Sequence, residues 1–282
     1  MAYLAASRSG RPPESVGPAV AAAGPSSQPS GGHATAVTIA ILMAVAWELA
    51  VRVGILSDLF VPPPSAIAVA LVHGFSGGDL LSNLAATLVR VGGGLALGGS
   101  AGLLAGLALG ASRRLGSIFN PFVAATHPIP KLSLLPLMMV FFGLGETPKI
   151  LVVAAAAFFP MLLNTMAGVR QISPVYFDAA RTYGASRRQL ITRVVLPGSV
   201  PMMLSGLRLA TNIAFLSTIA VEMVAAKDGL GSEVWLAWQV LRVDDLFATL
   251  TVIALFGVSV NAGLRALSRL GAPWLTAREI TI

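Results

Sequence analysis

The chain has 282 residues, of which 55% are hydrophobic and only 11% are charged, and its net charge is +7. Soluble domains contain about 25% charged residues, so this composition predicts an integral membrane protein. The chain has no cysteine, which excludes disulfides, thiolate nucleophiles and cysteine-based zinc or iron–sulfur sites. Its histidines, His33, His73 and His127, do not have the spacing of metal ligands.

The first 33 residues are rich in Ala, Gly, Ser and Pro, and they contain no apolar block of the length that a signal peptide requires. We expect residues 1–33 to form a disordered cytoplasmic tail and residues 34–282 to form a transmembrane domain. The first apolar segment is then an uncleaved anchor, and a processed leader is the alternative.

Six segments are apolar over about 20 residues, which is the length that a helix needs to cross a bilayer. They are residues 34–56, 85–110, 117–143, 149–169, 199–226 and 245–266. The predicted fold class is therefore all-α, a polytopic membrane protein with about six transmembrane helices. An even number of spans places both termini on the same side of the membrane.

The charged residues of the predicted loops separate by sign. Arginines follow the second, fourth and sixth spans, whereas the opposite loops carry mainly carboxylates. The arginines are Arg113, Arg114, Arg170, Arg181, Arg187, Arg188, Arg193, Arg265, Arg269 and Arg278, and the acidic residues are Asp58, Asp79, Glu146, Asp228, Glu233, Asp244 and Asp245. The positive-inside rule then predicts that both termini are cytoplasmic. Because topology explains the positive charge, no nucleic-acid partner is expected.

Two features lie early in the transmembrane domain. After the first span, VPPPSAIAVALVHGF predicts a short helix at the outer interface, with Ser65 as its N-cap. The second span has a glycine at every fourth position from Gly94 to Gly110. Helical residues four apart lie on one face, so these glycines predict a ridge against which another helix packs closely. We interpret the ridge as packing rather than function.

The third span contains the segment HPIPKLSLLP, whose three prolines predict a kinked or broken helix. Irregular backbone within a membrane must be buried in protein or line a cavity. Lys131 lies in this break, and Glu222 lies in the fifth span. Both are candidates for a translocation path. The alternative is that they form structural ion pairs, in which Lys131 binds Glu222 or Glu48.

Residues 174–198 form a polar connector between the fourth and fifth spans. YFDAARTYG predicts one short helix, Gly184 predicts a turn with positive φ, and ASRRQLITRVVLP predicts a second helix that ends at Pro197. The result is a helix-turn-helix outside the bilayer, with a small-residue patch and a basic rim. This shape suits docking into a protein socket, and a simple connector is the alternative.

Two motifs for chemistry are missing from this chain. A Walker A loop needs glycine before its lysine, and none of Lys131, Lys149 and Lys227 follows a glycine. The zinc-protease pattern His-Glu-x-x-His is absent as well. We therefore expect no enzyme activity and no cofactor on this chain. Two carboxylates within spans, Glu48 and Glu222, are too few for the proton relay of a secondary transporter, which is the rival class.

The polar connector resembles the EAA loop of ABC importer permeases, whose pattern is Glu-Ala-Ala, Gly, then Ile-x-Leu-Pro. Asp178-Ala179-Ala180, Gly184, Val194 and Leu196-Pro197 have the same spacing, with Asp in place of Glu and Val in place of Ile. The resemblance extends over about residues 55–275. LSLLPLMMVFFGLGETPKI, FFPMLLNTMAGVR and IAVEMVAAKDGLG resemble the subfamily that imports aliphatic sulfonates, taurine and nitrate. That subfamily also includes permeases for thiamine precursors, which are the alternative substrates.

The resemblance implies a type I ABC importer permease in the bacterial inner membrane that moves a small anionic solute. It implies a coupling loop that docks into a groove on a separate ATPase subunit, which binds ATP-Mg. The loop residues so implied are Asp178, Ala179, Ala180, Gly184, Arg187, Arg188, Leu196 and Pro197. The other implied partners are an extracytoplasmic solute-binding protein and a second permease copy in a homodimer.

Two roles in the loop stay open. Asp178 pairs with an arginine of the ATPase, or it favours the N-terminus of its own helix. Arg187 and Arg188 contact the ATPase partner, or they set the membrane topology or bind lipid headgroups instead.

Overall fold

A computed structural model describes residues 32–271 of the chain. The chain divides into two units, residues 1–46 and 47–282. Helix α1 (Gly32–Arg52) begins in the first unit and ends in the second. The expected N-terminal tail, residues 1–33, lies outside the described residues apart from its last two positions.

All regular elements within residues 32–271 are helical. After α1 they are α2 (Pro64–Ser76), α3 (Asp79–Gly94), η1 (Leu95–Gly99), α4 (Ser100–Ala111), α5 (Arg113–Thr126), η2 (Lys131–Leu134), α6 (Leu135–Phe142), α7 (Glu146–Arg170), α8 (Pro174–Thr182), α9 (Arg187–Leu190), η3 (Ile191–Val195), α10 (Leu196–Ala225), α11 (Leu230–Gln239) and α12 (Val243–Gly271). The all-α prediction is confirmed.

Five stretches of the described chain are long and apolar enough to cross a membrane. They are Thr35–Arg52, Asp79–Ala111, Glu146–Arg170, Arg187–Ala225 and Val243–Ser268, and the bent pair Arg113–Thr126 and Lys131–Phe142 makes a sixth if it counts as one span. The two halves of that pair meet at 86°. The predicted break in the third span is thus confirmed, and it falls at residues 127–130, where two of the prolines lie.

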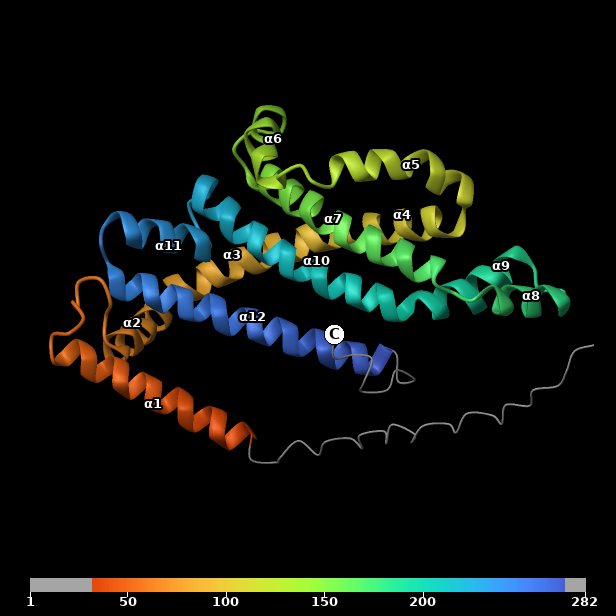
Figure 1. Ribbon diagram of the computed structural model, residues 1–282. Coiled ribbons are helices and arrows are strands. Elements are labelled where there is room, and N and C mark those ends of the chain that lie inside the picture. Colours follow the sequence, from red (N-terminus) through yellow and green to blue (C-terminus); the bar gives the residue numbers. More distant parts are fainter. Residues whose placement is uncertain (1–31, 272–282) are drawn as a thin grey trace, which may run out of the picture. The chain divides into compact units, whose positions relative to one another are not determined.

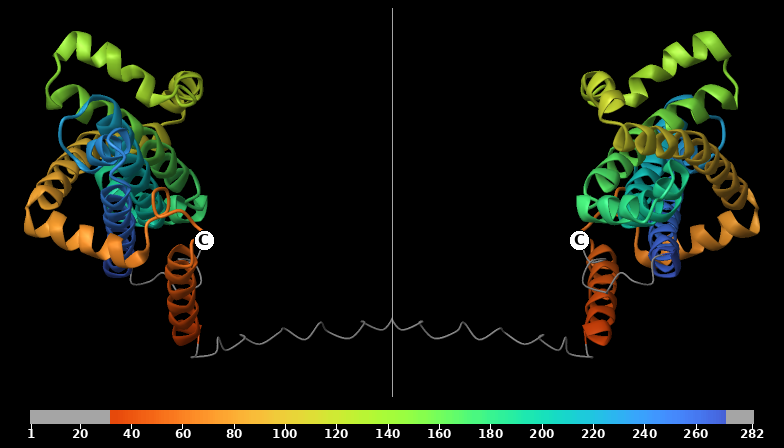
Figure 2. Two further views of the ribbon diagram at one scale, coloured as in Figure 1. Left: turned by 90° about the vertical axis from the view of Figure 1, so that its left-hand side faces the viewer. Right: turned by 90° about the vertical axis from the view of Figure 1, so that its right-hand side faces the viewer.

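In the second unit, α7 and α10 run side by side through the centre (Figure 1). Helices α5 and α6 lie along one side of them and α12 lies toward the other (Figure 2). The buried core where α3, α7 and α10 meet consists of Val91, Val153, Ala157, Met161, Ala210 and Ala214. Helices α8 and α9 lie at one end of the unit, and α11 and α2 lie at the opposite end (Figure 1).

The glycine ridge packs closely against α7, which confirms the predicted helix contact and identifies its partner. A Cβ atom on Gly98 would overlap the carbonyl group of Ala154, and one on Gly106 would lie 2.7 Å from the Leu162 oxygen. Gly94, Gly102 and Gly110 also face α7 residues. A π turn, η1, lies within the ridge. The two helices approach this closely because the ridge has no side chains.

Two local predictions were wrong. The helix does not end at Pro197: α9, η3 and α10 follow one another without a gap from Arg187 to Ala225. Proline lacks an N–H and crowds the carbonyl four residues earlier, but the π turn of η3 lies just before it and alters that spacing. Ser65 is not an N-cap, because α2 begins at Pro64 and the Ser65 N–H and hydroxyl both donate to Glu48.

Candidate functional site

Arg90 forms the centre of an ion-pair network at the end of the unit that carries α11, in which Arg90 and Glu222 are buried while the side chains of Glu146 and Asp228 are 52% and 60% exposed. Its Nη1 lies 2.9 Å from Glu222 Oε1, its Nε lies 2.6 Å from Glu146 Oε2, and its Nη2 lies 2.5 Å from Asp228 Oδ1. Nη1 also donates to the Asp228 carbonyl at 2.8 Å. Arg90 is 1% exposed and Glu222 is 0% exposed. A buried pair of this kind is costly to break, because removal of one partner leaves the other charge uncompensated.

Glu222 also holds the beginning of α11. Its Oε2 accepts the Gly231 N–H at 2.9 Å, and the Thr87 hydroxyl lies 3.0 Å from both of its oxygens. Thr87 in turn accepts the Leu230 N–H at 2.9 Å. The N–H groups of the first helical turn lack partners within the helix, so a carboxylate here satisfies donors and complements the helix dipole. Gly229 has φ +104, and a Cβ there would overlap Glu222 and approach Arg90.

The network joins four helices, because Arg90 belongs to α3, Glu146 to α7, Glu222 to α10, and the capped N–H groups to α11. Lys149 extends it with a 2.7 Å contact to Glu146. The sequence prediction named Glu222 but missed Arg90 and Thr87. Arg90 could have been found from the sequence, because it lies inside the second apolar span and an arginine there needs a partner within the protein. The structure places Glu222 here, fully buried, and away from any cavity described below.

Lys131 forms no ion pair with Glu222, Glu48 or any other carboxylate among the described residues. Its Nζ donates to the carbonyl oxygens of Thr126, His127 and Ile129 at 2.9, 2.9 and 2.6 Å. It also lies 4.4 Å from the ring centroid of Phe159 on α7. The lysine therefore bonds carbonyls at the end of α5 and in the break that follows it, and it holds the bend against α7.

We expect Lys131→Gln to lower the amount of assembled transporter while leaving uptake per complex unchanged. The ammonium group makes three charge-assisted hydrogen bonds, each worth about 1.5–3 kcal/mol, and glutamine cannot replace them all. Quantitative purification followed by transport assays in proteoliposomes measures both quantities. Lys227→Gln, an exposed change of the same type, serves as the control. Normal assembly with reduced uptake per complex would instead support a role on the translocation path.

The polar connector folds as the predicted helix-turn-helix. Helix α8 ends at Thr182, and Gly184 takes φ +72 in the turn. The Gly184 N–H donates to the Arg181 oxygen at 2.9 Å, and the Ala185 N–H donates to the Ala180 oxygen at 3.0 Å. A capping box then starts α9, in which Ser186 and Gln189 bond each other's backbone N–H. Glycine fits here because left-handed backbone carries no Cβ clash.

The connector carries exposed apolar and basic side chains. Val175, Tyr176 and Tyr183 are 70%, 65% and 90% exposed, which is unusual for a polar segment without a partner. Arg187 and Arg188 are exposed at the start of α9. Asp178 lies beyond the first turn of α8, where it contacts Arg181 at 3.5 Å. Ala179, Ala180, Leu196 and Pro197 complete the predicted set, with Ala180 and Leu196 half-buried.

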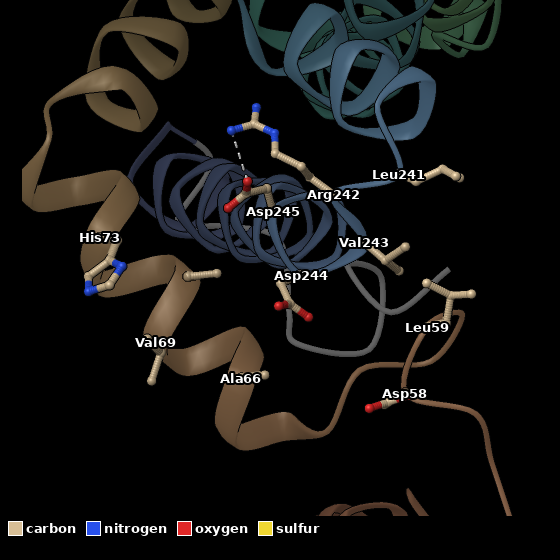
Figure 3. Close-up of a pocket in the computed structure, with 11 residues that line it drawn as sticks. Asp58, Leu59, Ala66, Val69, His73, Leu241, Arg242, Val243, Asp244 and Asp245 are labelled. Carbon is tan, nitrogen blue, oxygen red and sulfur yellow. Dashed lines mark ion pairs between the residues drawn. The ribbon is translucent and has the colours of Figure 1, made fainter.

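A cavity of about 670 Å³ lies at the α11 end of the unit, between the loop before α2, α2 itself and the start of α12. Figure 3 shows Asp58, Asp244 and Asp245 around it, facing Ala66, Val69 and His73 of α2. Arg242 contacts Asp245 at 3.2 Å and neutralises part of this charge. Within the described residues, no cluster of three or more His, Cys, Asp or Glu side chains could hold a metal ion.

One segment of the second span matches a sequence pattern that occurs at the active sites of hydrolases. Gly98-Gly99-Ser100-Ala101-Gly102 has the spacing of the Gly-x-Ser-x-Gly elbow, which places a nucleophilic serine on a sharp turn between a strand and a helix. Here Ser100 lies within a continuous helix, and its hydroxyl donates to the Ala96 oxygen at 2.5 Å. Ser100 is therefore a helix residue whose hydroxyl is bonded within its own helix, and it does not lie on the strand-to-helix turn that a nucleophile elbow requires.

Residues 98–276 match the family model described as "binding-protein-dependent transport system inner membrane component". The chain belongs to this family. It is 37% identical over 242 residues to the taurine transport system permease protein TauC of Escherichia coli, covering 84% of this chain and 88% of that protein. It is 30% identical to the putative aliphatic sulfonates transport permease protein SsuC of Bacillus subtilis, covering 85% and 87%.

A solved structure supports the fold. The chain matches the MetNI methionine ABC transporter in an inward-facing conformation with a TM-score of 0.51 and 18% identity, covering 68% of this chain and 94% of the other. The protein therefore has the type I importer permease fold. Members of this family are membrane components without enzyme activity, and a separate subunit hydrolyses ATP. Membership implies an ATPase and a substrate-binding protein as partners.

Proposed function

We propose that this permease imports taurine or another small aliphatic sulfonate. The observation that carries the proposal is the 37% identity to the taurine permease over 84% of the chain. The 30% identity to an aliphatic sulfonate permease over 85% of the chain agrees with it. In the proposed complex, two copies of this chain form a homodimer, two ATPase subunits bind ATP-Mg on one side, and a solute-binding protein docks on the other.

The helix-turn-helix of α8 and α9 is the proposed contact with the ATPase. Its exposed tyrosines and small residues supply an apolar surface, and Arg187 and Arg188 supply positive charge beside it. Docking would cover side chains that are otherwise left in water. Because α9 continues into α10 through η3, a movement of the loop would be passed directly to a spanning helix.

The proposed orientation places both termini and Gly184 in the cytoplasm, with Gly77 and Ser232 outside. It rests on the arginines that follow the second, fourth and sixth spans. The chain has no native cysteine, so single cysteines at positions 77, 184 and 232 can be tested directly in intact cells. An impermeant maleimide should label positions 77 and 232 but not 184. Labelling of position 184 from outside would show that the orientation is the opposite of the one proposed.

The function is tested by uptake of labelled taurine into proteoliposomes that contain the permease, its ATPase and its binding protein. We expect ATP-dependent uptake, inhibited by other aliphatic sulfonates but not by thiamine precursors. Inhibition by thiamine precursors but not by aliphatic sulfonates would show that the proposed substrate is wrong. It would not affect the family to which the chain belongs.

We expect Gly184→Leu to abolish ATP-driven uptake in the same assay, because it strains the turn and adds bulk where the ATPase docks. Left-handed backbone costs a residue with a side chain about 1–2 kcal/mol. Gly54→Leu is the matched control, since Gly54 has φ +82 and both positions have no heavy atom within 4 Å of an added Cβ. The control carries the same strain outside the coupling loop and should retain uptake. Equal losses in both variants would argue against docking.

A further inference from the structure

A basic cavity of about 670 Å³ lies beside the coupling loop, between the start of α5, the end of α7 and α8. Each of these elements contributes one arginine to its lining: Arg113, Arg170 and Arg181. The acidic residue in the lining is Asp178, which contacts Arg181 at 3.5 Å. Among the described residues, neither Arg113 nor Arg170 has a carboxylate within ion-pair distance. The cavity therefore has an excess of positive charge that suits a tetrahedral oxyanion.

A second, apolar cavity adjoins the basic one. It has a volume of about 320 Å³, lies between α5 and α7, and is lined by Val123, Ala124, Leu163 and Met166 together with His127. Asn120 lines both cavities. Its Oδ1 is buried without a hydrogen-bond partner in the described part of the chain. Residues 120 to 127 span about 10 Å of helix at 1.5 Å per residue, so the lining changes from basic to apolar over a short distance along α5.

We propose that the two cavities form one binding site for an anionic phospholipid. The phosphate lies against Arg113, Arg170 and Arg181, and an acyl chain lies in the apolar groove between α5 and α7. Basic pockets between membrane helices are suited to anionic headgroups. The Asn120 amide lies where the headgroup meets the chain, and it can accept from a glycerol hydroxyl or turn to donate to the phosphate. A free sulfonate shares the oxyanion chemistry but would leave the groove empty.

The site has a consequence for coupling. Pro174, Phe177, Asp178 and Arg181 of α8 form one wall of the basic cavity, and Val195 of η3 contributes to it. A lipid bound here contacts both the coupling loop and the ends of two spans. It therefore braces the loop at the point where movement of the ATPase would enter the membrane domain.

The headgroup is tested by measuring phosphatidylglycerol that remains bound to the purified permease–ATPase complex after detergent exchange. We expect Arg113→Gln to reduce retention about fivefold, which corresponds to about 1 kcal/mol for one arginine near an anionic surface. Arg114→Gln is the matched control, because Arg114 is adjacent, carries the same charge and does not line the cavity. Equal retention in both variants would overturn the proposal.

The acyl chain is tested with Ala124→Trp, which fills the apolar groove, and with Ala125→Trp, which adds the same bulk outside it. We expect loss of phosphatidylglycerol from the first variant and normal retention in the second. Melting temperatures measured without added lipid should be equal for the two, which separates lost binding from misfolding. If taurine displaces phosphatidylglycerol and Ala124→Trp has no effect, the site binds a free sulfonate and the lipid proposal is wrong.

Discussion

Replacing Arg90 with methionine is expected to remove most of the folded permease from the membrane. Glu222 is fully buried, so the loss of its arginine leaves an uncompensated carboxylate among four helices. Breaking a buried pair from one side typically costs about 3–5 kcal/mol, which is a large share of the stability of a typical protein. Arg90→Lys should be nearly as harmful, because a lysine cannot bind Glu146, Glu222 and Asp228 with one planar fork. The amount of monodisperse protein in mild detergent measures the effect.

Two further variants make the Arg90 result specific. Adding Glu222→Gln to Arg90→Met should recover part of the lost protein, because it removes the stranded charge. Arg242→Met is the control for an arginine with two acidic contacts, but its side chain is 53% exposed, so its loss should cost only about 0–1 kcal/mol. If the losses of folded protein caused by Arg90→Met and by Glu222→Gln simply add in the double variant, the two residues are not coupled as the geometry requires.

Gly98→Ala should also destabilise the folded permease, although it adds a single methyl group. That methyl would occupy the position of the Ala154 carbonyl on α7, so α3, η1 and α4 would have to move away from α7. Overpacking of this kind typically costs about 1–3 kcal/mol, and here it opposes backbone rather than a flexible side chain. The expected result is a lower melting temperature for the purified protein and a smaller yield.

Gly92→Ala is the matched control for the glycine ridge. Gly92 lies in the same helical stretch, but an added Cβ there has no heavy atom within 4 Å. Alanine favours the helix by about 1 kcal/mol relative to glycine, so this variant should be unchanged or slightly more stable. Equal behaviour of Gly92→Ala and Gly98→Ala would show that α7 does not pack on the ridge as described.

The sequence by itself determined the features that depend on nearby residues. Hydropathy located the spans, because a helix must be apolar over the thickness of a bilayer. The prolines located the break in the third span, and Gly184 located the turn with positive φ, because both effects act on the local backbone. The spacing of the glycines predicted a close helix contact but did not identify α7 as the partner. The spacing of the polar connector indicated the family.

The tertiary structure alone decided which polar side chains meet. Arg90 is 56 residues from Glu146, 132 from Glu222 and 138 from Asp228, so no local pattern predicts that network. Lys131 was expected in a path or an ion pair, yet its own bent segment supplies three carbonyls for its ammonium group. In a membrane, a charged side chain must find a partner within the protein, and the folded backbone determines which partner lies within reach.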